Sequence, residues 1–164
     1  MGMLYAMVGG FVLLMVGIVF FAIKMGQKEQ GRQRTLLESV AQPKGLTITK
    51  QGFFVLAKGK MDGVNVEFGF KSGGGKHTEL QVTINDPDFD AATGRIRSHK
   101  LEGDAGILPQ GLTPDLRETL GGVSELTLDP GRIRFWRQQD KFTDSAENID
   151  LTVNTLLSLR HAGA

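Results

Sequence analysis

A glycine-rich loop that contains a lysine is the first stretch of this sequence with the residue types of a ligand-binding site. Residues 72–78 read Ser-Gly-Gly-Gly-Lys-His-Thr. A phosphate-binding P-loop needs glycine where the chain has Phe70, and serine or threonine where it has His77. A P-loop also leads into a helix, whereas residues 80–84 alternate between apolar and polar types as a strand does. We therefore interpret the segment as a hairpin loop and predict no cofactor.

Three aspartates at alternate positions, Asp86, Asp88 and Asp90, have the spacing of calcium-loop ligands. A calcium loop that starts at Asp86 would have glycine at its sixth position and glutamate at its twelfth. The chain has Ala91 and Arg97 there. An Asp-Pro-Asp sequence is more typical of a turn in which side chains cap the backbone. We predict a turn and no metal site, with calcium binding as the alternative.

The other residue types that serve in catalysis are scattered along the chain. His77, His99 and His161 share no zinc-ligand spacing. No serine lies in a Gly-x-Ser-x-Gly sequence, and the absence of cysteine excludes thiolate nucleophiles, thiolate metal ligands and disulfides. We predict no catalytic residue and no enzymatic activity. The alternative is an enzyme whose Asp, Arg and His residues are brought together only by the fold.

A basic and aromatic cluster in the C-terminal third is typical of binding. In the strand predicted for residues 132–137, alternation places Arg132, Arg134 and Trp136 on one face and two apolar residues on the other. Tryptophan and arginine are enriched among the residues that dominate interface energies. We predict a partner interface at these three residues; the alternative is an ordinary solvated sheet face.

The overall charge argues against nucleic acid as a partner. The chain has 164 residues with 19 Lys and Arg against 18 Asp and Glu, and every one of these charges lies beyond residue 23. A nucleic-acid-binding domain usually carries a clear basic excess. The part of the chain after residue 23 has the length of one domain and is too short for two ordinary ones.

Capping residues and periodicity predict the elements in the first half of that domain. Thr35 and Glu38 form a capping box that starts a short helix, and Pro43 ends it. Strands are predicted at residues 46–49, 53–60, 64–70 and 80–84, and Asp62-Gly63 is a tight-turn signal between two of them. We expect an antiparallel meander.

The second half is predicted to mix helices with a hairpin. Residues 95–99 are a candidate strand, and Thr113-Pro114 begins a short helix that Gly121-Gly122 ends. A hairpin follows over residues 123–137. The last helix begins near Asp144. One side of it, which we expect to cover the sheet, is formed at helical spacing by the apolar residues Ile149, Val153, Leu156 and Leu157, followed by Arg160. The predicted fold class is α+β, with a small antiparallel sheet covered by helices.

Residues 3–23 contain no charged side chain, and Lys24 follows them directly. As a helix this segment would be about 31 Å long, close to the hydrocarbon thickness of a bilayer, about 30 Å. A cleaved signal peptide would have a basic n-region, a shorter apolar run and an Ala-x-Ala-like site. We therefore predict a single N-terminal transmembrane helix that is retained.

The residues around this segment predict its orientation and its contacts. Lys24, Lys28, Arg32 and Arg34 follow it, so the positive-inside rule places the N-terminus outside and the C-terminal domain in the cytoplasm. The same four cations are candidate contacts for anionic headgroups, or simply a flank that sets the topology. Small residues that would let another membrane helix pack closely lie at Gly2, Ala6, Gly10 and Gly17.

Three short stretches carry a resemblance to a known group. They are Asp86-Pro-Asp-Phe-Asp90, then Leu112-Thr-Pro-Asp-Leu-Arg117 with Leu120, and Arg132-Ile-Arg-Phe135. Together they resemble a group of bacterial proteins that pair an N-terminal membrane segment with a compact α+β domain and have no established activity. The resemblance covers roughly residues 36–160. It implies the domain outline, and no functional residue follows from it.

The predicted organisation has three parts: a transmembrane helix (1–23), a basic juxtamembrane linker (24–34) and a soluble α+β domain (35–161). For residues 26–33 the alternative is a frayed continuation of the membrane helix. The predicted function is that of a non-enzymatic, single-pass inner-membrane protein, an accessory or scaffolding subunit of a larger assembly. Its expected partners are membrane lipid and other membrane subunits, with no cofactor. The alternatives are a membrane-tethered sensor or lipid- or ligand-binding module, and an enzyme with an unrecognised site.

Overall fold

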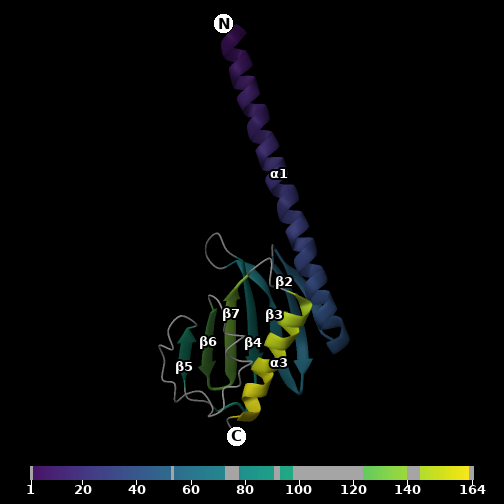
Figure 1. Ribbon diagram of the computed structural model, residues 1–164, viewed down its shortest axis with the longest axis vertical. Helices are drawn as coiled ribbons and strands as arrows, with labels where there is room; N and C mark the ends of the chain where they lie inside the picture. Colours follow the sequence, from purple (N-terminus) through teal and green to yellow (C-terminus); the bar gives the residue numbers. More distant parts are fainter. Residues whose placement is uncertain are drawn as a thin grey trace.

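The computed structural model has the α+β architecture that the periodicity predicts: a seven-stranded antiparallel sheet with helices on one face (Figure 1). It describes residues 2–52, 54–72, 78–90, 93–97, 124–139 and 145–162. Within these ranges the side chains of residues 2–9, 12, 72, 96, 161 and 162 are not described. The helix predicted at residues 113–120 and the loop at 73–77 lie outside the described residues.

The described elements follow one another as helix, sheet and helix. They are α1 (Gly2–Ala41), η1 (Gln42–Lys44), β1 (Thr47–Gln51), β2 (Phe54–Met61), β3 (Val64–Ser72), β4 (Thr78–Asn85), β5 (Gly94–Arg97), β6 (Ser124–Asp129), β7 (Arg132–Gln138) and α3 (Ala146–Ala162).

The strands lie in the order β1-β2-β3-β4-β7-β6-β5. The first four form the predicted meander, and the turn between β2 and β3 has positive φ at both Asp62 (48°) and Gly63 (86°). That is the conformation for which an Asp-Gly pair is favoured in two-residue hairpins. The hairpin of β6 and β7 then adds to the meander through β7, so that β7 pairs with β4 and β5 becomes the far edge.

The hydrophobic core lies between the sheet and the helices. Alternation in β3, β4 and β7 directs Phe68, Val82 and Phe135 toward the same face, where all three are buried and in register. The apolar face predicted for the last helix is confirmed, because Ile149, Val153 and the neighbouring leucines of α3 are buried against this face. The last turns of α1 pack beside α3 (Figure 1).

The capping box predicted at Thr35 is wrong, because α1 runs through it without a break from Gly2 to Ala41. The Thr35 hydroxyl donates to the Gly31 carbonyl one turn back, 3.1 Å away, as it does in a helix interior. Residues 24–34, predicted as a linker, therefore form part of the helix. They contain no proline, and Gln, Lys, Glu and Arg are good helix formers that outweigh Gly26 and Gly31. Pro43 and Gly45 end the helix as expected.

One glycine in the sheet is required by close packing. A Cβ added at Gly69 in β3 would lie 2.2 Å from the Val55 carbonyl oxygen and 2.9 Å from the Leu56 Cα, both on the neighbouring strand. Backbone atoms of a paired strand cannot move aside as the end of a side chain can. Glycine at this position also leaves the space in which the Leu56 side chain is buried.

We therefore expect Gly69→Ala to lower the free energy of unfolding by about 1–3 kcal/mol, the usual cost of overpacking. Chemical denaturation of the full chain measures this value. Gly31→Ala is the matched control, because an added Cβ there meets nothing within 4 Å. Equal stability of the two variants would show that β2 and β3 can separate at this point.

Candidate functional site

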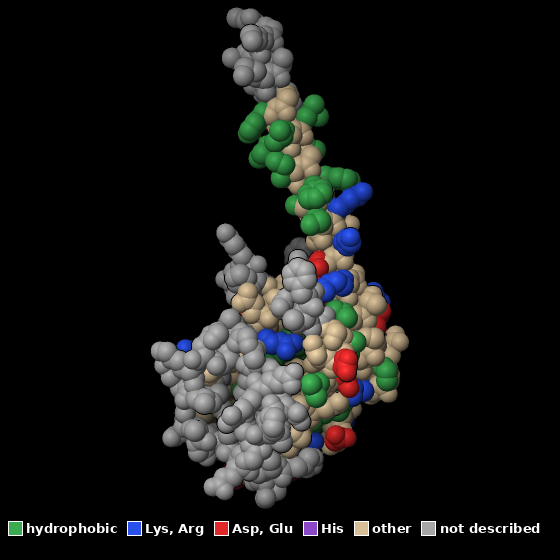
Figure 2. Space-filling model, in the orientation of Figure 1, with side chains coloured by type: hydrophobic (Ala, Val, Ile, Leu, Met, Phe, Trp, Pro, Cys, Tyr) green, Lys and Arg blue, Asp and Glu red, His purple; other side chains and the backbone are tan. Residues whose placement is uncertain are grey.

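The most unusual surface of the protein is the N-terminal part of α1, which projects away from the domain with large apolar side chains exposed (Figure 2). Leu13 is 74% exposed, Met15 48% and Phe21 65%. Four consecutive exposed residues, Leu13 to Val16, are separated by about 100° each and so occupy every side of the helix. A helix that is apolar on all sides is normally buried in a protein or a membrane.

Over the part of the chain that the structure describes, no helix combines the length and the apolarity needed to cross a membrane. The described part of α1 therefore does not support the predicted transmembrane helix.

The four predicted headgroup contacts lie along the same helix in different settings. Lys24 lies over the ring of Phe20, with Nζ 5.3 Å from the ring centroid. Arg32 and Arg34 form ion pairs within the helix, with Glu29 (3.0 Å) and Glu38 (2.6 Å). Arg34 is about 15 Å from Lys24 along the helix axis. This exceeds the Debye length of about 8 Å at physiological salt, so a charge at the level of Lys24 is largely screened from Arg34. Lys24 and Lys28 are thus the cations nearest the apolar segment.

The predicted helix-packing residues are only partly open to description. A Cβ added at Gly10 or Gly17 would meet nothing within 4 Å, so both positions face open space. Gly2 and Ala6 lie in the part of α1 whose side chains are not described. The close packing predicted for these four residues stays a prediction.

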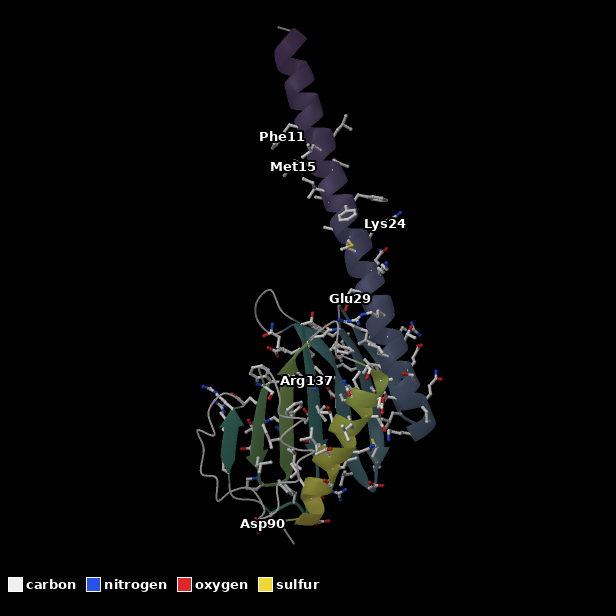
Figure 3. All side chains as sticks on the ribbon, viewed as in Figure 1. Phe11, Met15, Lys24, Glu29, Asp90 and Arg137 are labelled. Atoms are coloured by element: carbon white, nitrogen blue, oxygen red, sulfur yellow. The ribbon has the colours of Figure 1, made fainter. Side chains whose placement is uncertain are left out.

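A polar cluster fastens α1 to the sheet at the level where the exposed segment ends (Figure 3). The Glu29 carboxylate accepts hydrogen bonds from Arg32 (3.0 Å), Gln33 (3.4 Å) and Gln139 (3.3 Å), and the Gln33 amide also donates to Gln139 Oε1 (3.0 Å). Gln139 directly follows β7, more than a hundred residues away in the chain. Sequence reasoning missed this contact because no local pattern pairs these residues.

The predicted interface residues do share one surface. Arg132, Arg134 and Trp136 lie on the face of β7 opposite the helices, since Ile133 and Phe135 are buried in the core. Arg134 pairs with Asp129 (2.7 Å) and Arg132 donates to the Asn85 side chain (2.9 Å). The predicted alternation is confirmed. The partner interface at these three residues stays a prediction.

The same face continues onto β5 and β6, where sequence reasoning found nothing. Glu125 lies opposite Trp136 and accepts ion pairs from Arg95 (3.2 Å) and Arg97 (2.8 Å). The Glu125 side chain is only 11% exposed, while the two arginines are each 57% exposed. We call the surface formed by Arg95, Arg97, Arg132, Arg134 and Trp136 the basic sheet face. Its signal in the sequence was the Arg-Ile-Arg repeat at residues 95–97 and again at 132–134.

Asp86 has a structural role. Its carboxylate accepts a hydrogen bond from Arg160 of α3 (2.5 Å) and another from the Asp88 backbone (3.1 Å). The buried Asp86 carboxylate is thus neutralised by arginine, and the turn predicted for this segment is confirmed. Asp88 and Asp90 are exposed. Among the residues that the structure describes, no group of three His, Asp or Glu side chains is arranged to hold a metal ion.

Other predicted features fall outside the description. His77 and His99 lie outside the described residues, and so does the side chain of His161. The apolar helix segment and the basic sheet face are therefore the candidate sites that the described part of the chain offers.

Comparison of the chain with protein-family models, with the sequences of curated proteins and with solved structures found no match. The resemblance based on residues 86–90, 112–120 and 132–135 thus receives no support from these comparisons.

Glu67 lies between two lysines at the other end of the same sheet face. It pairs with Lys58 (2.9 Å) and Lys71 (3.3 Å). Partial burial alone would raise the pKa of Glu67, but the hydrogen bonds and positive charge of the two lysines outweigh it and hold the pKa below the usual 4.5.

A carboxylate with a lowered pKa in the folded state stabilises the protein above the unfolded pKa and loses this contribution as pH falls through the folded pKa. We expect the wild-type protein to lose part of its stability below about pH 4.5, and Glu67→Gln to lose less over the same range. Thermal melts of both proteins from pH 6 to 3 measure this difference. Identical pH profiles would exclude a contribution from Glu67.

Proposed function

We propose that the protein is a non-enzymatic, single-pass membrane protein whose residues 3–23 insert into the bilayer. The observation that carries the proposal is the exposure of apolar side chains on every side of α1 from Phe11 to Met25. In water such a surface is costly, at about 25 cal/mol for each Å². Burial among lipid chains removes that cost. The uncharged sequence of residues 3–9 extends the segment to the length that a bilayer requires.

The basic residues that follow favour a cytoplasmic domain in an inner membrane. Lys24 and Lys28 lie at the end of the exposed apolar segment, where the headgroups of anionic lipids would be. The N-terminus would then lie outside. This orientation places the sheet and α3 next to the cytoplasmic leaflet.

The proposed role is that of an accessory or scaffolding subunit. The basic sheet face offers four exposed or half-exposed arginines around Trp136, balanced among the described residues of β5–β7 by Glu125 and Asp129. This excess of positive charge suits a partner surface rich in acids. Gly10 and Gly17, where an added Cβ would meet nothing within 4 Å among the described residues, suit contact with another membrane helix.

Lysines placed in the apolar segment should release the protein from membranes. We expect the double variant Val16→Lys/Phe20→Lys to remain at the bottom of a flotation gradient with phospholipid vesicles, while the wild-type chain floats. Val16 lies near the middle of residues 3–23, where a lysine costs about 2.5–3.5 kcal/mol. The lysine at position 20 lies nearer the end of the segment and adds a smaller cost.

The matched control is Met25→Lys/Leu151→Lys. It replaces two exposed large apolar residues outside residues 3–23 and adds the same charge. It should float like the wild type. Flotation of the Val16/Phe20 variant, or failure of the wild type to float, would contradict membrane insertion.

Loss of the aromatic side chain on the basic sheet face should weaken partner association. We expect fewer companion subunits to co-purify with Trp136→Ala than with the wild type in mild detergent, as measured by mass spectrometry. The thermal midpoint of the variant should stay close to that of the wild type. Lys60→Ala, exposed on the same side of the sheet in β2, is the control and should retain its companions. A large drop in the midpoint would instead assign Trp136 to the packing of the domain.

A further inference from the structure

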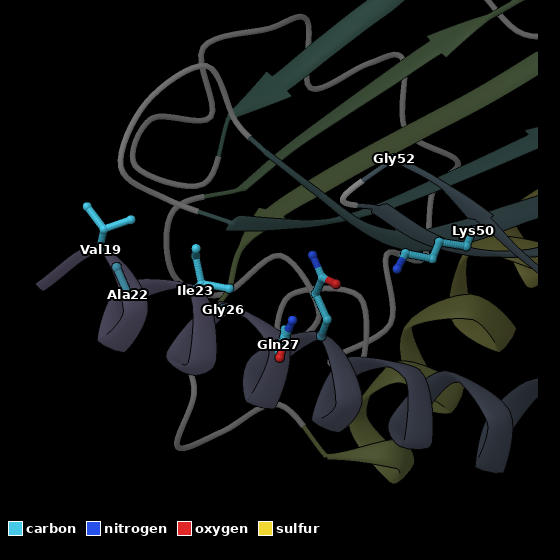
Figure 4. Close-up of a pocket in the computed structure, with 8 residues that line it drawn as sticks. Val19, Ala22, Ile23, Gly26, Gln27, Lys50 and Gly52 are labelled. Carbon is cyan, nitrogen blue, oxygen red and sulfur yellow. The ribbon is translucent and has the colours of Figure 1, made fainter. Parts of the chain in front are cut away.

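A groove runs between α1 and the turn that joins β1 to β2, at the place where the helix leaves the domain (Figure 4). It has a volume of about 570 Å³. Its walls are Val19, Ala22, Ile23, Gly26, Gln27 and Gln30 of α1, with Lys50 and Gly52 from the strand side. The volume lies in the range of small-molecule sites, roughly 300–1,000 Å³.

The lining of the groove changes from apolar to polar along the helix. Val19, Ala22 and Ile23 form one end, and Gln27 and Gln30 form the other. The distance from Val19 to Gln30 along the helix axis is about 16 Å. The apolar end belongs to the segment proposed to enter the membrane, and the polar end lies just beyond it. The groove therefore matches the orientation of a lipid in the leaflet next to the domain, with its apolar end toward the acyl chains and its polar end toward the headgroups.

Lys50 gives the polar end its charge. It pairs with Val55 in the sheet register, in a row that continues through Phe70 to Leu80, so its side chain lies on the helix-covered face of the edge strand. Figure 4 shows this side chain extended toward α1. Lys50 is exposed, and none of the described residues that line the groove is an acid. A single cation beside two amides suits one phosphate monoanion.

We propose that this groove binds one anionic phospholipid, with an acyl chain along Val19, Ala22 and Ile23 and the phosphate beside Lys50. The proposal rests on the membrane attachment proposed above. It assigns a specific lipid contact to the edge strand β1 of the folded domain, separate from the general attraction of Lys24 and Lys28. Bound lipid would fill the space between α1 and the β1–β2 turn and so fix the domain against the membrane surface.

Two pairs of variants test the site. Gly26→Leu fills the groove from the helix, and an added Cβ at Gly26 meets nothing within 4 Å, so the helix accepts it. Gly31→Leu adds the same side chain at an equally open helical position outside the groove. Lys50→Gln removes the cation, and Lys60→Gln removes an exposed lysine from β2.

The full chain is reconstituted in nanodiscs of phosphatidylcholine with a minor share of phosphatidylglycerol, and the lipid retained after release into detergent is counted by native mass spectrometry. We expect wild type, Gly31→Leu and Lys60→Gln to retain phosphatidylglycerol in preference to phosphatidylcholine. Lys50→Gln should retain about fivefold less of it, the factor expected for one lysine contact. Gly26→Leu should also retain less, because its side chain occupies the groove.

Equal retention of the two lipids, or unchanged retention in Gly26→Leu, would overturn the proposal. Competition by soluble glycerol phosphate would also overturn it, because the headgroup alone would then suffice. Flotation of the same proteins with vesicles separates the two proposals. A chain that floats but retains no phosphatidylglycerol contradicts only the lipid groove, whereas a chain that does not float contradicts membrane attachment as well.

Discussion

The attachment of α1 to the sheet is the contact on which the rest of this structure depends. Leu37, Val40 and Ala41 of its last turns are buried in the core, and the Glu29 cluster ties the middle of the helix to the end of β7. Apolar burial in the last turns supplies stability, while the hydrogen bonds around Glu29 set the angle at which the helix leaves. Because both contacts lie on one unbroken helix, the exposed segment is held at a fixed angle to the domain, and its end at Val19–Ile23 lies beside the sheet.

This arrangement links the three surfaces that we interpret functionally. The apolar segment, the groove beside Lys50 and the basic sheet face all have positions fixed relative to one sheet. The groove lies at the level where the apolar segment ends, and the basic face lies on the side of the sheet away from α3. A domain held in this way has its own helices on one side of the sheet and the basic sheet face on the other.

Local patterns in the sequence were sufficient for most of the fold. Alternation identified the strands, Asp62-Gly63 identified the turn, and helical spacing from Ile149 to Arg160 identified the face of α3 that is buried. The continuous helix was missed because Thr35 and Glu38 match a capping box equally well inside a helix, where tertiary packing of Leu37 and Val40 decides the outcome. The order of strands could not be predicted, since nothing local indicates that β7 pairs with β4.

The candidate sites also divide into features that local sequence predicts and contacts that only the fold reveals. The apolar segment and the face shared by Arg132, Arg134 and Trp136 follow from composition and alternation. The contacts of Glu125 with Arg95 and Arg97, of Asp86 with Arg160, and of Gln33 with Gln139 join residues far apart in the chain, so they appear only once the strands are placed. Lys50 is the clearest example: its strand was predicted only approximately, and its position beside α1 depends on where the helix leaves the sheet.

The continuity of α1 also has a mechanical consequence. Because α1 has no break between Ile23 and Ala41, it would act as a rigid lever about the membrane surface if residues 3–23 insert as proposed. A tilt of about 20°, common for single membrane helices, would swing Ala41 sideways by roughly 9 Å and carry the whole sheet with it. A thinner bilayer increases the tilt of an inserted helix. It would therefore rotate the domain and change the direction in which the arginines of the basic sheet face point.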